Sequence, residues 1–138
     1  MADYFDAGKF GSVVAIAFGH ANVTTGESNT DLTLEQSTLA CMPVGGSVIG
    51  LSVRSSASIT AGTITAKAHK AGTEYTDSSA PAPAASSAAQ ASYASCGPGK
   101  VTFDAGDTLG VSVSTTTTLD PTNTLDVDAV LFVQLNAS

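Results

Sequence analysis

The 138-residue chain contains no tryptophan and few charged residues. Asp, Glu, Lys and Arg make up 12% of the residues, about half the usual fraction for a soluble domain. Only five of these residues are basic, against twelve acidic ones, so the formal net charge is −7. Nucleic-acid binding requires basic residues that neutralise phosphates, and docking on anionic membranes requires a basic surface too. The composition therefore argues against both kinds of partner.

Long hydrophobic runs are also missing. No apolar stretch approaches the roughly 20 residues that cross a bilayer. The N-terminus, "MADYFDAGKF", has early acidic residues and no continuous apolar run, so we expect no secretory signal and a chain made and folded in the cytoplasm. Cys41 and Cys96 allow a single pairing. In a reducing compartment we expect two free thiols, buried as small hydrophobic residues, with a disulfide as the alternative.

Alternation of apolar and polar residues runs through most of the chain, whereas helical periodicity is nearly absent. It is clearest in the last segment, where one face is apolar throughout: Leu125, Val127, Ala129, Leu131, Val133 and Leu135. On the opposite face, Asp126 and Asp128 are followed by Val130 and Phe132. This change predicts that one end of the strand is covered on both sides, by a partner chain or by a long loop.

Earlier segments show the same period. Two further apolar faces are predicted: Val14, Ile16 and Phe18 ahead of a turn at residues 19–22, and Ile49, Leu51 and Val53. Residues 77–95 begin with a run rich in Ala, Ser and Pro that has no periodicity. We expect a long surface loop there.

These signals predict about eight strands separated by short turns, the pattern of an antiparallel sandwich or barrel. Strands at both ends of the chain and a long final strand fit a jelly roll better than an immunoglobulin sandwich, whose buried tryptophan is missing here. We therefore predict an all-β, antiparallel jelly-roll sandwich. Residues 1–12 would form an N-terminal arm and residues 13–138 the jelly-roll domain, with the long loop at 77–95.

Two pairs of carboxylates are candidates for chemistry. Asp104 and Asp107 flank a glycine, and the best interpretation is a turn whose Asp side chains bind nearby backbone amides, because the dense acidic pattern of a calcium loop is missing. Asp126 and Asp128 share one strand face, which we interpret as a solvated or interface face. Neither pair predicts a catalytic site.

Histidine and cysteine chemistry is equally sparse. His20 falls in the predicted turn and His69 on the outward face of a strand, and neither has a ligand partner at the spacing that a metal site requires, so both are expected to be surface residues. Cys96 precedes Gly-Pro-Gly and is expected near the surface. No serine lies in a nucleophile elbow and no phosphate-binding loop is present. We expect no catalytic residues, no cofactor and no metal, and therefore no enzyme.

The N-terminal arm is the strongest candidate for binding a partner. Tyr4, Phe5 and Phe10 place three of the eight aromatic residues within the first ten positions. Aromatic side chains are common anchors in protein interfaces. The alternative is that the arm folds back on its own sandwich, which would also bury the rings.

The segments "GSVIGLSVRSSASITAGTITAKAHKAGTEYT" and "KVTFDAGDTLGVSVSTTTTLDPTNTLDVDAVLFVQL" resemble single jelly-roll structural proteins of tailed bacteriophages. These include capsid decoration, or cement, proteins and the globular domains of tail fibres and spikes. The shared features are "TAGT" before an exposed strand, "FDAGDTLGV" leading into a Thr-rich strand, a proline turn and a long final strand. The resemblance covers residues 45–136, and the Ala/Ser/Pro loop fits it least.

The resemblance implies a homotrimer on the exterior of a virion capsid, bound to the major capsid protein and stabilising the expanded shell. Carried onto this chain, it implies that the arm, through Tyr4, Phe5 and Phe10, reaches the capsid or a neighbouring trimer. The alternative is a receptor- or glycan-binding head of a tail fibre or spike. The host and the capsid surface contacted are left open, and so is the lattice axis.

Overall fold

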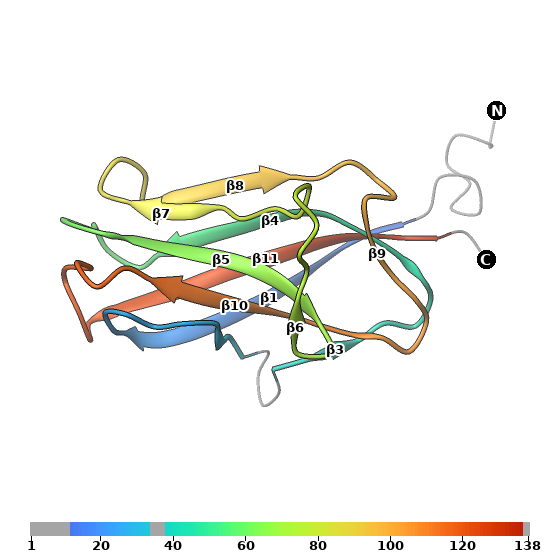
Figure 1. Cartoon of the computed structure of the whole chain (residues 1–138), viewed down its shortest axis with the longest axis horizontal. Helices are drawn as coiled ribbons and strands as arrows, with labels where there is room; N and C mark the ends of the chain where they lie inside the picture. Colours follow the sequence, from blue (N-terminus) through green and yellow to red (C-terminus); the bar gives the residue numbers. More distant parts are fainter. Residues whose placement is uncertain (1–11, 34–37, 137–138) are drawn as a thin grey trace.

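The computed structural model describes residues 12–33 and 38–136, and within these ranges it contains β-strands and no helix. The strands form two antiparallel sheets (Figure 1). The first, here the β4 sheet, contains β1 (Ser12–Val23), β4 (Gly46–Ser55), β8 (Ala91–Ser95), β9 (Val101–Phe103) and β11 (Leu125–Leu135). The second, here the β5 sheet, contains β2 (Thr30–Asp31), β3 (Ala40–Cys41), β5 (Thr63–Lys70), β6 (Thr73–Glu74), β7 (Ala84–Ser86) and β10 (Thr108–Thr115).

The strand order is that of a jelly roll. Neighbours run β1–β11–β4–β8 in one sheet and β2–β10–β5–β6 in the other. Three positions in the sheets are each occupied by two short strands that pair with the same neighbour. Strands β8 and β9 both pair with β4, β2 and β3 both pair with β10, and β6 and β7 both pair with β5. The described strands thus occupy four positions in each sheet, joined as in two Greek keys. The predicted antiparallel jelly-roll sandwich is confirmed.

The core lies between the two sheets and is formed by the predicted alternation. On β11 the predicted apolar face is buried from Leu125 to Val133, with Leu135 packed at its end. On β5, Ile64, Ala66 and Ala68 point inward in the same way. Burying such side chains contributes the main favourable free energy of folding. On β5 and β11 the inward and outward faces therefore follow the hydrophobic period.

A β-bulge in β4 changes one predicted face. The register pairs Phe132 with Gly50 and then Val133 with Val48, so Ile49 is an extra residue on its strand. An extra residue shifts the alternation by one position and reverses which side chains point inward. Val48 is consequently fully buried, whereas Ile49, predicted to share the core face with Leu51, is only partly buried.

Two segments differ from the sequence prediction. The predicted turn at residues 19–22 is part of β1, which continues to Val23 with a register irregularity and a positive φ of 55° at Asn22. Residues 77–95, predicted as one long loop, contain β7 and β8. Their backbones pair with β5 and β4, so hydrogen bonding to sheet neighbours orders a segment whose own sequence has no strand period. Of the predicted arm, residues 1–12, the first eleven lie outside the described residues, and Ser12 begins β1.

Candidate functional site

The Asp104–Asp107 segment is a turn, as predicted. The Asp104 amide donates to Asp107 Oδ2 at 2.7 Å, and the Asp107 amide donates to the Asp104 carbonyl at 3.1 Å. Gly106 between them has a φ of 87°, which glycine adopts readily. The Asp107 carboxylate is also 4.0 Å from Lys70 Nζ. The Asp107 carboxylate and the Asp104 backbone thus order the entry to β10.

The second acidic pair is divided between two partners. Asp128 Oδ2 accepts a hydrogen bond from Arg54 Nη2 at 2.7 Å. Asp126 Oδ1 accepts a hydrogen bond from the backbone amide of Asn22 at 3.1 Å. The cation, which strand β4 supplies, is 74 residues away in sequence, so local spacing could not reveal it. The two carboxylates thus have different partners.

The two histidines lie in different surroundings from those predicted. His20 is within β1, where its Nε2 is 2.9 Å from Glu27 Oε1. His69 is on the outward face of β5 but is buried, with 1% of its surface exposed. Its ring lies against Gly110 and the Thr38 carbonyl, and its Nε2 is 3.2 Å from Asp31 Oδ1 without hydrogen-bond geometry. The expectation of a surface His69 was wrong because a segment from the sheet edge packs over it.

Both cysteines are free thiols. Cys96 is buried, as expected for a free thiol but not from its Gly-Pro-Gly turn, whereas Cys41, also expected to be buried, is exposed. Burial, and secondarily the charge of Asp77, raises the pKa of the Cys96 thiol. A higher pKa means less thiolate at neutral pH, so Cys96 is a poor nucleophile.

Within residues 12–33 and 38–136, no group of three or more His, Cys, Asp and Glu side chains is placed to hold a metal ion. The same ranges contain no helix long and apolar enough to cross a membrane. The predicted anchors of the arm, Tyr4, Phe5 and Phe10, lie outside the described residues.

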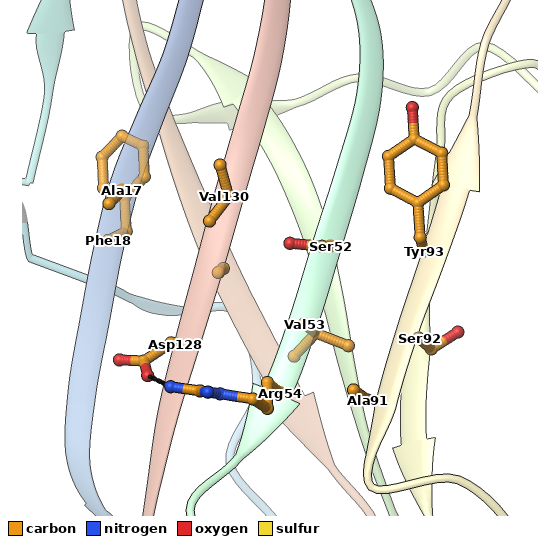
Figure 2. Close-up of a pocket in the computed structure, with 11 residues that line it drawn as sticks. Ala17, Phe18, Ser52, Val53, Arg54, Ala91, Ser92, Tyr93, Asp128 and Val130 are labelled. Atoms are coloured by element: carbon orange, nitrogen blue, oxygen red, sulfur yellow. Dashed lines mark hydrogen bonds and ion pairs between the residues drawn. The ribbon is translucent and has the colours of Figure 1, made fainter.

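The outer face of the β4 sheet contains a hollow with a volume of about 590 Å³. It spans β1, β11, β4 and β8, and Figure 2 shows Tyr93 of β8 on the opposite side from Ala17 of β1. The floor is made of small side chains, including Ser52 of β4. Because these side chains are short, the surface of the sheet is lower here than at the larger side chains around the hollow.

Strand register arranges this face into three rows. The aromatic row consists of Ala15, Phe132, Gly50 and Ser95. The central row consists of Ala17, Val130, Ser52 and Tyr93. The charged row consists of Gly19, Asp128, Arg54 and Ala91. The hollow therefore lies between an aromatic end and an ion pair.

The aromatic end is held by close packing. The rings of Tyr93 and Phe132 meet edge to face, with centroids 5.8 Å apart and an interplanar angle of 79°. The Tyr93 hydroxyl lies over Gly50, where a Cβ atom would collide with it. Tyr93 still exposes 56% of its surface. Glycine at position 50 thus lets a large ring lie along the sheet while one face of the ring is open to a partner.

The charged end is a surface ion pair. Arg54 and Asp128 side chains are 65% and 60% exposed, and Figure 2 shows them reaching toward each other across β4 and β11. An ion pair at this exposure contributes little to stability, on the order of 0–1 kcal/mol. Its groups are thus available for other contacts.

The outer face of the β5 sheet has a different character. Lys67 Nζ is 3.9 Å from Glu74 Oε1, and the Ser112 hydroxyl is 3.3 Å from Glu74 Oε2. Thr and Lys side chains occupy its outward positions on β5, beside the buried His69. A face of paired polar groups has less to gain from burial against a protein, so the β4 sheet presents the better interaction surface.

Sequence reasoning found part of this surface. The outward apolar residues Val130 and Phe132 indicated that one end of the final strand is covered on both sides, by a partner chain or by the long loop, and Tyr93, within the predicted loop, packs on Phe132. Tyr93 and Arg54 were missed as site residues. Arg54 could have been placed outward by alternation with Val53, but Tyr93 had no such signal because its segment was predicted as a loop.

No protein-family model and no curated protein sequence matches the chain. Among solved structures, the fold is similar to that of a chain in the cyanophage Pam1 capsid asymmetric unit, with a TM-score of 0.50 and 16% sequence identity. The match covers 91% of this chain and 86% of that chain. At this level of identity the likeness is one of fold.

Proposed function

We propose that this chain is a structural protein of a tailed-phage virion, bound to the outside of the capsid, where it stabilises the expanded shell as a decoration, or cement, protein. The major capsid protein would be its main partner, and the proposed assembly is a homotrimer. The N-terminal arm, with Tyr4, Phe5 and Phe10, would extend the contact.

The outer face of the β4 sheet, which residues 12–33 and 38–136 leave exposed, is the observation that carries this proposal. It combines exposed Tyr93 and Val13 with small side chains around a hollow, in a chain that has few charges. Such a face gains free energy when a protein covers it. The sequence resemblance to phage decoration proteins and the fold likeness to a phage capsid chain support the same role.

We also propose that the role is not catalytic. The ionisable groups that could have formed a site lie in separate places: Asp107 is in a turn, His20 contacts Glu27, and Asp128 pairs with Arg54. These contacts order the fold and do not converge on a shared pocket. An assembly role requires only complementary surfaces.

Copy number in the purified source particle tests the proposal. Quantitative mass spectrometry would compare this chain with the major capsid protein. We expect the two in comparable amounts, because a decoration protein occupies sites repeated over the lattice. Absence from the particle would refute the virion assignment.

The alternative, a receptor- or glycan-binding head, is favoured by one observation. Tyr93 lies exposed in the hollow, with Arg54 and Asp128 at one end, and sugar sites combine an aromatic face with polar groups. A handful of copies per particle, together with binding on a glycan array that Tyr93→Ala removes, would support this alternative over decoration.

A further inference from the structure

We propose that the outer face of the β4 sheet binds the same face of a second copy of this chain. The two copies are related by a twofold axis that lies along the central row. The inference does not depend on the capsid role, because it concerns the isolated chain. It rests on the order of the three rows, on their charge and on the size of the face.

The order of the rows is self-complementary. A twofold axis in the interface that runs parallel to the strands would place like rows over each other, whereas an axis lying along the central row brings the aromatic row of one copy over the charged row of the other. In that arrangement Arg54 of each copy lies over Gly50 of its partner, which the Tyr93 hydroxyl covers and which pairs with Phe132. Guanidinium groups stack well on aromatic faces, and an isologous contact makes every such interaction twice.

Charge favours a second copy at this face. The chain carries a net charge of −7, so most contacts between two copies bring like charges together. The three rows contain one cation, Arg54, and one anion, Asp128, which cancel. Asp126 lies just beyond the charged row, where it accepts a hydrogen bond from the Asn22 amide. The face is thus a neutral area on an acidic protein, and two copies meet there without net repulsion.

The size of the face predicts a weak contact. Four strands about 4.8 Å apart, and a length of about 20 Å from Val13 to Gly19, give about 400 Å² per copy. Two such faces bury about 800 Å², below the range of stable complexes. We therefore expect a dimer that dissociates in dilute solution and forms at high local concentration.

Cross-linking at the axis tests the arrangement. Ser52 lies in the central row, so a cysteine there should approach its own counterpart in the second copy. Ser52→Cys would be made in a Cys41→Ser background, because Cys41 is the exposed thiol, and treated with a short bis-maleimide. The matched control is Thr73→Cys in the same background, on exposed β6 of the other sheet. We expect dimer from Ser52→Cys and little from Thr73→Cys; equal yields would overturn the proposal.

Two further variants separate this contact from accidental association. Ala17→Asp, on the exposed side of β1, places two added carboxylates in each twofold contact. It should reduce the yield of cross-linked dimer from Ser52→Cys about tenfold. Arg54→Ala should weaken dimerisation about tenfold in sedimentation equilibrium, since two stacking contacts are lost. Thr73→Asp adds the same charge elsewhere and should change neither result. Self-association unaffected by Ala17→Asp and Arg54→Ala would overturn the proposal.

Discussion

Gly110 shows how one missing side chain positions the buried imidazole. It pairs with His69 across β10 and β5, and a Cβ atom there would lie 2.7 Å from His69 Nε2 and 2.6 Å from the Thr38 carbonyl oxygen. Gly19 is a strand glycine of a different kind, because its nearest atoms would be 3.7 Å from an added Cβ, an ordinary contact distance. Glycine is therefore required at position 110 and not at position 19.

Substitution by alanine at these two glycines should therefore have unequal effects. We expect Gly110→Ala to lower the free energy of unfolding by about 1–3 kcal/mol, because the added methyl group forces the His69 ring and a backbone carbonyl to move. Gly19→Ala is the matched control and should be neutral or slightly stabilising. Urea denaturation of both variants gives the comparison. Equal stability would contradict the packing seen at Gly110.

The bulge in β4 determines that Val48, and not the adjacent Ile49, belongs to the core. Val48 is fully buried between the sheets, whereas Ile49 is the unpaired extra residue and is partly exposed. Strict alternation predicted the opposite. Hydrophobicity by itself would also rank the larger Ile49 as the core residue.

We expect Val48→Ala to lower the free energy of unfolding by about 1.5–3 kcal/mol, the value for burying such a side chain. Ile49→Ala should cost clearly less, although it removes more atoms, because the side chain is already partly in water. Chemical denaturation of both variants under identical conditions tests the bulge. A larger loss for Ile49→Ala would place the bulge elsewhere in the strand.

At the scale of the whole molecule, the chain combines an acidic composition with one neutral, hollow sheet face and an aromatic N-terminal segment. The described part of the sandwich starts at Ser12, and Tyr4, Phe5 and Phe10 precede it in the sequence. The folded body and the proposed arm can therefore be tested separately.

Deletion of residues 2–10 should abolish or strongly reduce binding to expanded capsids, because it removes the proposed aromatic anchors. The melting temperature should change little, which circular dichroism would show. Cosedimentation of the variant with capsids lacking the native protein measures the binding. Full binding by the variant would exclude the arm as the anchor and leave the β4 sheet as the candidate surface.

The fold could be predicted in large part because each long strand has its own apolar face. Leu125 to Leu135 alternate in sequence as they do in the structure, and the Asp104–Asp107 turn has its own side-chain hydrogen bonds. The candidate surface was less predictable. Tyr93 belongs to a strand that is ordered by pairing with β4, and Arg54 meets Asp128 only because β4 and β11 are neighbours.

The sequence by itself determined that the chain is an antiparallel β protein, because hydrophobic period and turn chemistry act between residues close in the chain. Only the tertiary structure decided the burial of His69, the shift of the core from Ile49 to Val48, and the three rows around the hollow. Each of these depends on strand register and on which strands are neighbours. Contacts between distant segments establish both, so local patterns carry little information about them.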